Sequence, residues 1–359
     1  MRQAVRYFRP NVEAMAGYVP GEQPQGDGYI KLNTNENPYP PPRSVLQAIR
    51  AAVNDRLRLY PDPLATDLRR KIAEVYGTRT ERVIVGNGSD DILAMLVRAV
   101  AGPGRAVAYP VPTYSLYPTL CRIVDAPVRE VPYPHDFSLP ADRLVRARAA
   151  LTFVASPNSP SGTVIPPADL GRLARRLRGL LAIDEAYVDF ADEHCLHLVE
   201  RHRNVVVLRS FSKSFSLCGI RLGFAVAREE IVEGLAKVKD SYNVNRLAQV
   251  AGLAALEAIG VMRAHAEQIR ATRARLVRGL EAFGWRVYPS QANFVFARVR
   301  PPATARGIYE ALKARRILVR WFDSPGLEDG LRISVGSERE TDVLLRELGR
   351  LCAPHASRA

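Results

Sequence analysis

Residues 204–224 read NVVVLRSFSKSFSLCGIRLGF, and they decide how the rest of the chain is interpreted. Asn204 to Leu208 is a short apolar run rich in valine, which is typical of a buried strand. A serine-rich turn follows and carries Lys213, one of only six lysines among 51 basic residues. Because burial disfavours the charged ammonium, a lysine in an apolar turn is a candidate nucleophile. The alternative is a surface lysine whose ammonium stays in water, so the surroundings of Lys213 must decide.

Length and composition are those of a globular protein with one large or two modest domains. The chain has 359 residues, of which 47% are hydrophobic and 25% charged. No apolar run approaches the ~20 residues of a membrane span, and the first residues lack the apolar core of an export signal. The cysteines form no C-x-x-C pair, which is typical of reduced thiols; they are Cys121, Cys195, Cys218 and Cys352. We therefore expect a cytoplasmic protein with no membrane partner.

The net charge of +14 and the pI near 9.9 leave two classes of function to separate. The basic residues are nearly all arginine and are spread along predicted helix faces, as in residues 68–77 and 170–180. They form no basic tail and no stripe interleaved with aromatic residues. We therefore expect anionic small ligands and no nucleic acid. A basic nucleic-acid-binding protein remains the alternative from a different class.

Strands and helices alternate between residues 40 and 245, which predicts a doubly wound, mostly parallel sheet. One strand ends in the turn Gly86-Asn87-Gly88-Ser89-Asp90, where a helix start can bind an anion. Ligands of such sheets bind beyond the carboxyl ends of the strands, so Lys213, Asp184, Asn158, Tyr114 and Gly88 should share one rim. The expected strands are 83–85, 106–109, 122–125, 151–155 and 180–183.

Three segments follow from the change of pattern along the chain. Residues 1–39 are rich in proline and glycine and are expected to form an arm that joins the small domain. Residues 40–246 form the large domain. Residues 247–359 form a smaller α+β domain, which begins with one long helix or two and ends with a strand at 331–336 and a closing helix.

Eight further segments can be compared with known families: GYVPGEQP (17–24), IKLNTNENPYPPP (30–42), YPDP (60–63), GNGSDD (86–91), SPNSPSG (156–162), AIDEAYVDF (182–190), ILVRWF (317–322) and LRISVGS (331–337). In order and spacing, together with residues 204–224, they resemble the fold type I pyridoxal-phosphate aminotransferases, and within them those that act on histidinol phosphate. The resemblance covers essentially the whole chain. It implies an α/β fold with a large doubly wound, mostly parallel sheet domain and a smaller α+β domain, and pyridoxal 5′-phosphate as cofactor.

The resemblance also assigns the catalytic residues. Lys213 matches the lysine that forms a Schiff base with the cofactor, and Asp184 matches the carboxylate that faces the pyridine nitrogen. Tyr187 and Asn158 match the residues that hydrogen-bond the 3-oxygen of the ring. The chain departs from the family here, because it has Asn-Ser-Pro-Ser-Gly at 158–162 where many relatives have Asn-Asn-Pro-Thr-Gly. The contact to the ring oxygen is therefore open between Asn158 and Ser159.

The binding residues fall into three groups by the same resemblance. The cofactor phosphate is expected to meet the main-chain amides of Gly88, Ser89 and Asp90, the hydroxyls of Ser210 and Ser212, and Arg221, while Tyr114 stacks on the ring. Tyr60 matches a tyrosine that reaches the phosphate from the neighbouring subunit, which implies a homodimer with shared active sites. Arg332 matches the arginine that binds an α-carboxylate, and the substrate phosphate would be held by Arg320, Tyr18 and Asn37.

The resemblance implies a two-step transamination of histidinol phosphate with 2-oxoglutarate, which gives imidazole-acetol phosphate and glutamate in histidine biosynthesis. An aromatic-amino-acid aminotransferase and a threonine-phosphate decarboxylase remain alternatives, because a phosphate and a carboxylate require similar donors. No metal is expected: the spacing of His194, Cys195, His197 and His202 matches no common zinc site.

Overall fold

The computed structural model describes residues 7–18 and 21–352. In this part of the chain, seven strands form the large sheet in the order β2-β8-β7-β6-β5-β3-β4. The strands from β3 to β7 run parallel to one another, and β8 is antiparallel to both neighbours. Their bounds are β2 Val83–Gly86, β3 Val107–Val111, β4 Val128–Pro132, β5 Leu151–Ala155, β6 Leu180–Asp184, β7 Val205–Ser210 and β8 Gly223–Ala227.

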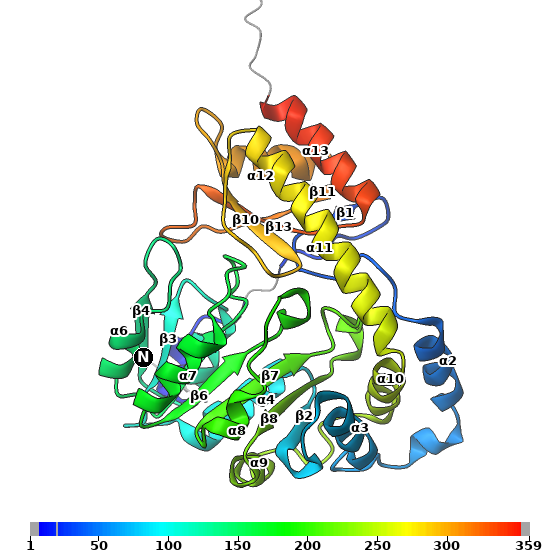
Figure 1. Cartoon of the computed structure of the whole chain (residues 1–359), viewed down its shortest axis with the longest axis vertical. Coiled ribbons are helices and arrows are strands. Elements are labelled where there is room, and N and C mark those ends of the chain that lie inside the picture. Colours follow the sequence, from blue (N-terminus) through cyan, green and yellow to red (C-terminus); the bar gives the residue numbers. More distant parts are fainter. Residues whose placement is uncertain (1–6, 19–20, 353–359) are drawn as a thin grey trace, which may run out of the picture.

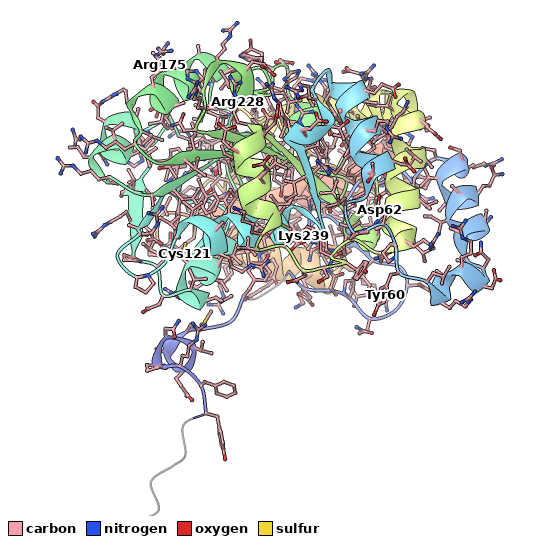
Figure 2. The ribbon with its side chains drawn as sticks, turned by 90° about the horizontal axis from the view of Figure 1, so that it is seen from below. Tyr60, Asp62, Cys121, Arg175, Arg228 and Lys239 are labelled. Atoms are coloured by element: carbon pink, nitrogen blue, oxygen red, sulfur yellow. The ribbon has the colours of Figure 1, made fainter. Side chains whose placement is uncertain are left out.

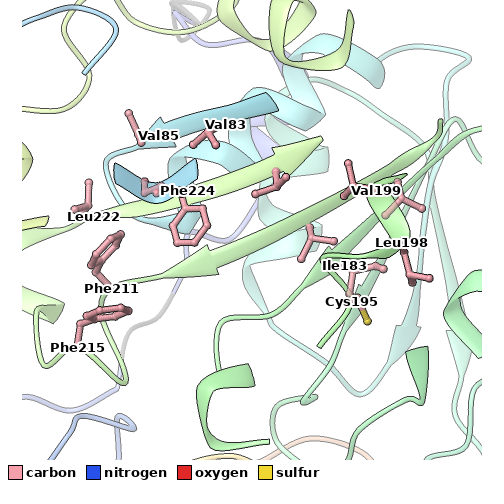
Figure 3. Packing of buried hydrophobic residues seen from close by; sticks show 14 of the residues in the cluster. Val83, Val85, Ile183, Cys195, Leu198, Val199, Phe211, Phe215, Leu222 and Phe224 are labelled. Carbon is pink, nitrogen blue, oxygen red and sulfur yellow. The ribbon is translucent and has the colours of Figure 1, made fainter. Parts of the chain in front are cut away.

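Helices cover both faces of this sheet, so its central strands are buried on both sides (Figure 1). Side chains alternate along β7: Val205 and Val207 pack into one core, and Val206 and Leu208 into the other. Figure 3 shows the first of these cores, where Phe211, Phe215 and Phe224 meet the strand valines. The helices of the large domain are α2 Arg43–Ala52, α3 Thr66–Tyr76, α4 Ser89–Val100, α5 Leu116–Ile123, α6 Ala141–Arg146, α7 Pro167–Arg176, α8 Leu198–Arg201 and α9 Glu229–Ala236.

A smaller unit has its own antiparallel sheet in the order β12-β13-β10-β9 and its own core. A segment of the arm joins it, because β1 pairs in parallel with β11 and Leu32 is buried in its core. Its elements are β1 Ile30–Lys31, α11 Ile259–Ala282, β9 Arg286–Val287, β10 Phe294–Arg298, α12 Ala305–Ala314, β11 Ile317–Leu318, β12 Arg320–Trp321, β13 Gly330–Ser334 and α13 Glu338–Cys352. The arm also carries α1 Pro10–Ala14. Short 3-10 helices lie at Asp55–Arg58, Thr80–Arg82, Val188–Phe190 and Cys218–Ile220.

The change from one core to the other comes later in the chain than the expected boundary after residue 246. Helix α10 (Arg246–Glu257) packs on α2 and α3, and its buried alanines belong to the core of the large domain. Met262 in α11 still belongs to that core, whereas Ala266 belongs to the smaller one. The helical period of residues 247–283 continues across this change, so the sequence pattern alone did not mark it.

The strand predicted at residues 122–125 is wrong. Residues 116–123 form α5, and the strand β4 lies further on, at residues 128–132. Tyr117 and Cys121 are four residues apart and both fully buried, which is the spacing of one helix face. Asp125 then has a left-handed backbone (φ 55°) that turns the chain toward β4. Helix α3 ends at Gly77, whose left-handed backbone (φ 64°) is typical of a helix C-cap.

No single helix in residues 7–18 and 21–352 has the length and apolar composition needed to cross a membrane. Helices α10 and α11 meet that test only as a pair, and they are bent by 75° at their junction.

Candidate active site

Lys213 lies in the loop that follows β7, and several contacts hold this loop in place. The side-chain amide of Asn37 donates to the carbonyl oxygens of Lys213 and Ser214, at 3.1 and 3.0 Å. Ser214 Oγ also donates to the carboxylate of Asp189. The Lys213 ammonium donates to Thr34 O at 3.3 Å and lies 5.7 Å from the centre of the Tyr187 ring. The arm therefore reaches the lysine, and its amine faces a tyrosine.

Asp184 ends β6, the strand next to β7, and its carboxylate is 95% buried. Tyr117 Oη donates to Oδ2 at 2.9 Å, and the Ala186 N–H donates to Oδ1 at 3.1 Å. Burial raises the pKa of Asp184 to about 6, although both hydrogen bonds oppose the shift. Across the described residues, no basic side chain forms an ion pair with it. A buried carboxylate without a cation is costly, so this site suits a ligand with a protonated ring nitrogen.

The start of α4 forms an anion-binding turn. Gly88 is the N-cap, has φ 85°, and leaves the first N–H groups of the helix without a side-chain cap. A Cβ on Gly88 would come within 2.7 Å of Arg221 Nη2, and one on Gly223 within 2.4 Å of the Ser89 nitrogen. The two glycines therefore allow the turn, β8 and the guanidinium to pack together.

Hydroxyl groups complete this cradle. Arg221 Nη1 donates to Ser212 Oγ at 3.4 Å, and the Ser212 N–H donates to Ser210 Oγ at 3.1 Å. The Asp90 side chain accepts from Arg221 Nη2 at 3.0 Å and from the Tyr114 hydroxyl at 3.1 Å. Amides, hydroxyls and a guanidinium at one helix start suit a phosphate. The predicted phosphate residues are thus brought together, and Asp90 also positions Arg221 and Tyr114.

The two residues predicted near the ring oxygen differ in what they contact. Tyr187 Oη accepts a hydrogen bond from Asn35 Nδ2 at 3.0 Å. The Asn158 side chain is already engaged: Oδ1 accepts from Thr113 and Nδ2 donates to Pro112 O, both in the loop after β3, and Nδ2 also donates to Ser161 Oγ in its own loop. Ser159 Oγ instead accepts from Arg332 Nη1 at 3.0 Å. Asn158 therefore stabilises the loop that presents Ser159.

Arg332 and Arg320 lie directly opposite each other on the antiparallel strands β13 and β12. Neither forms an ion pair within the part of the chain that the structure describes. Arg332 donates from Nη2 to Asn33 O at 2.7 Å, and its buried Nε has no partner there. Burial, together with the charge of Arg320, lowers the pKa of the Arg332 guanidinium. Like charges opposite each other on a sheet are unfavourable, so this pair is suited to an anion.

The remaining predicted residues lie at the margin of this group or away from it. The Tyr18 ring packs edge-on against Tyr114, with centroids 6.4 Å apart. The side-chain amide of Asn37 already donates to two carbonyl oxygens of the Lys213 loop, so its donor groups are not free for a substrate. Tyr60 is 78% exposed on the loop before α3 (Figure 2). Its ring stacks on Tyr242, and in the described residues it makes no contact with the groups around Lys213.

Sequence reasoning missed Asn35, Tyr117 and Thr34, although each contacts a predicted site residue. Asn35 lies between Asn33 and Asn37 in a stretch that had been singled out, and Tyr117 lies one helical turn after Tyr114. These spacings were visible, but the partners lie far away in the chain. No group of three or more histidine, cysteine, aspartate or glutamate residues in the described ranges is arranged to hold a metal ion.

A mostly parallel sheet whose rim carries a lysine loop, a buried carboxylate without a cation and an anion-binding turn is the arrangement expected of a pyridoxal-phosphate enzyme. The sequence model of aminotransferase class I and II matches residues 27–348, and the chain belongs to this family. The predicted family and fold class are therefore confirmed, as is the prediction of an aminotransferase.

Relatives within the family share nearly the full length of the chain. Histidinol-phosphate aminotransferase 1 of Nostoc sp. is 48% identical over 343 residues, which are 95% of this chain and 97% of the relative. The histidinol-phosphate aminotransferase of Syntrophotalea carbinolica is 46% identical and covers 95% and 98%. The crystal structure of histidinol-phosphate aminotransferase from Sinorhizobium meliloti, in complex with pyridoxal-5′-phosphate, matches with a TM-score of 0.89 at 26% identity. That match covers 98% of this chain and 99% of that one.

Pyridoxal phosphate is the cofactor of this family, and the residues of this chain fit it. The unpaired, buried carboxylate of Asp184 suits the protonated pyridine nitrogen. The uncapped start of α4, with Arg221 and the two serine hydroxyls, suits the phosphate. Lys213 supplies the amine for the aldehyde.

Proposed function

We propose that the protein transaminates histidinol phosphate with 2-oxoglutarate to give imidazole-acetol phosphate and glutamate, a step of histidine biosynthesis. The observation that carries the proposal is the facing pair of Arg320 and Arg332, which has no acidic partner in the described residues. Both amino-group donors and acceptors of this reaction carry a phosphate or carboxylates, and two guanidinium groups can bind either. The names of the relatives that cover nearly the whole chain support the same substrate.

The residues of the chain have distinct roles in this reaction. When bound, pyridoxal phosphate supplies an electron-withdrawing ring that stabilises negative charge at the substrate α-carbon. Asp184 keeps a proton on the ring nitrogen, and the raised pKa of its buried carboxyl is lowered again once that cation is present. Lys213 would hold the cofactor through its amine and, once displaced by the substrate amine, would carry a proton between the substrate α-carbon and the C4′ carbon of the cofactor. Arg332 orients the substrate anion so that this carbon faces the lysine.

The test uses the purified protein and three substrates. We expect visible absorbance from bound cofactor, and turnover of histidinol phosphate with 2-oxoglutarate that exceeds turnover of phenylalanine or threonine phosphate. Lys213→Ala should abolish turnover, whereas Lys237→Ala, which changes an exposed lysine, should not. Faster turnover of phenylalanine would instead indicate an aromatic-amino-acid aminotransferase, and release of carbon dioxide from threonine phosphate a decarboxylase. A colourless protein that shifts DNA at moderate salt would support the nucleic-acid alternative.

We also propose that the enzyme is a homodimer with shared active sites, located in the cytoplasm. The dimer is supported by several large apolar side chains that are exposed close to Tyr60 in the sequence, because exposed apolar residues that cluster are typical of interfaces; they are Leu57, Leu59 and Leu64. The location is supported by the four cysteines, none of which is in a disulfide.

A further inference from the structure

We propose that Asn35 positions Tyr187 so that the phenolic O–H donates into the active site, to the ring oxygen of the bound cofactor. This proposal rests on the function proposed above, and it names a positioning residue that the motifs did not assign. Asn35 comes from the arm, Tyr187 from the loop after β6, and the residues that hold Asn35 from the smaller unit. Three parts of the chain thus meet at Asn35.

The backbone of Asn35 is held on both sides. Its N–H donates to Ser334 Oγ at 2.9 Å, and its carbonyl oxygen accepts from Asn293 Nδ2 at 2.9 Å. Asn35 is 99% buried and has a left-handed backbone with φ 58°, which asparagine adopts more readily than most residues. Its side chain therefore has little freedom.

The hydrogen bonds determine which end of the amide faces Tyr187. Ser334 Oγ already accepts from the Asn35 N–H, and its own hydrogen is donated to Asn35 Oδ1 at 3.0 Å. Since Oδ1 accepts from the serine, the Nδ2 end of the amide faces Tyr187 Oη, at 3.0 Å. An amide orientation is assigned from its network, and here the serine hydroxyl makes the reverse orientation unfavourable.

The hydrogen bond from Asn35 leaves the Tyr187 hydroxyl free to act as a donor. Because Tyr187 Oη accepts from Asn35, the phenolic hydrogen stays available for an acceptor in the site, and the described residues offer it none. The Lys213 ammonium lies 5.7 Å from the centre of the Tyr187 ring. A hydrogen bond donated by Tyr187 to the ring oxygen of the cofactor would stabilise negative charge on that oxygen. The pKa of the nitrogen that joins Lys213 to the cofactor would then be lower.

The same segment also contacts the substrate-binding strand. Arg332 is two residues before Ser334 on β13 and donates to Asn33 O at 2.7 Å. Residues 33–35 are therefore held along β13 by Arg332 and Ser334 together. A shift of this strand on anion binding would move Asn35 and, through it, Tyr187.

The experiment measures the pH at which the visible absorbance of the bound cofactor changes. Asn35→Gly keeps the left-handed backbone and removes the amide; Asn35→Asp keeps the size but offers Tyr187 only an acceptor. We expect this pH midpoint to rise in both variants, most in Asn35→Asp, by up to roughly one pH unit for a lost hydrogen bond to a charged oxygen. Tyr187→Phe should raise it in the same direction, and adding Asn35→Gly to Tyr187→Phe should change nothing further.

A matched control separates positioning from general loosening. Asn204→Ala removes hydrogen bonds to Ala174 O and Gly179 O at the far end of β7, so it should lower the melting temperature and leave the midpoint unchanged. The proposal is overturned if Asn35→Gly titrates like the wild type, if its shift persists without the Tyr187 hydroxyl, or if Asn204→Ala shifts the midpoint equally. A wild-type protein without visible absorbance would overturn the proposed function instead.

Discussion

At the scale of the residue, the candidate site contains charged side chains that have no ion-pair partner in the described structure. Asp184 is a buried carboxylate that accepts two hydrogen bonds but has no cation beside it in the described structure. Its pKa is raised to about 6 because burial outweighs those hydrogen bonds. The ligand-free protein therefore contains a buried carboxyl group without a counter-charge, and the protonated ring nitrogen of the cofactor would supply that counter-charge.

This burial predicts a pH dependence of the apoprotein. The pKa of Asp184 rises from 3.8 unfolded to about 6 folded, so folding is favoured below pH 3.8 and that advantage is lost as the pH rises through about 6. The loss amounts to about 3 kcal/mol of unfolding free energy. Asp184→Asn should remove this loss. The unfolding free energy of the variant apoprotein, measured by denaturation from pH 4 to 7, should therefore change less with pH than that of the wild type. Parallel profiles for the two proteins would contradict this account.

At the scale of the element, the pairing of β12 with β13 creates the arginine pair that we propose binds the substrate. The register places Arg320 opposite Arg332, and the strand then carries Ser334 to Asn35. This pairing therefore places the two arginines side by side. The same strand also carries Ser334, which contacts Asn35, and the Asn35 amide donates to Tyr187. A slip of β12 by one residue would move Arg320 to the other face of the sheet, away from Arg332.

Arg320→Gln should separate stability from function at this pair. Removing one of two facing like charges should leave the ligand-free melting temperature unchanged or raise it, because such pairs cost about 0.2–1 kcal/mol. The same change should raise the KM for histidinol phosphate by roughly ten- to 150-fold, because a charged hydrogen bond to the anion contributes about 1.5–3 kcal/mol. Thermal unfolding without ligand and steady-state kinetics measure the two effects. Arg339→Gln, an exposed change on α13, is the control, and equal KM values in the two variants would argue against the anion site.

At the scale of the whole molecule, the site belongs to several parts of the chain at once. The large domain provides Asp184 at the end of β6 and Lys213 in the loop after β7, the smaller sheet provides Arg320 and Arg332, and the arm provides Asn35. Figure 1 shows how the two sheets and the arm are arranged. Tyr60 is exposed and, among the described residues, makes no contact with this group. An exposed tyrosine of this kind supports the homodimer proposed above.

A mixing experiment tests the shared site. Lys213→Ala and Tyr60→Ala homodimers should each have little activity. After subunit exchange, a mixed dimer has one site with both defects and one site with neither, so activity should return to as much as roughly half of the wild-type value per mixed dimer. Sedimentation should show a dimer throughout. No recovery despite proven exchange would mean that Tyr60 acts within its own chain.

Local signals in the sequence were sufficient for the alternation of strands and helices, the glycine turn before α4, and the placement of Asp184 and Lys213 after neighbouring strands. Each is encoded within a short window, by side-chain period or by turn residues. The strand predicted at 122–125 failed because Ile123 and Val124 favour a strand locally, while packing of Tyr117 and Cys121 makes the segment helical.

The sequence by itself thus determined the family and the layered α/β fold, and it predicted residues that the structure brings to one rim of the large sheet. Only the tertiary structure showed which hydroxyl donates to Asp184, which amide donates to Tyr187, and that Arg320 lies opposite Arg332 with no acid paired to either in the described residues. The physical reason is distance along the chain: the bond between Asn35 and Ser334 joins residues 299 positions apart. No local period or turn preference encodes such a contact, and it forms only when the arm and two cores pack together.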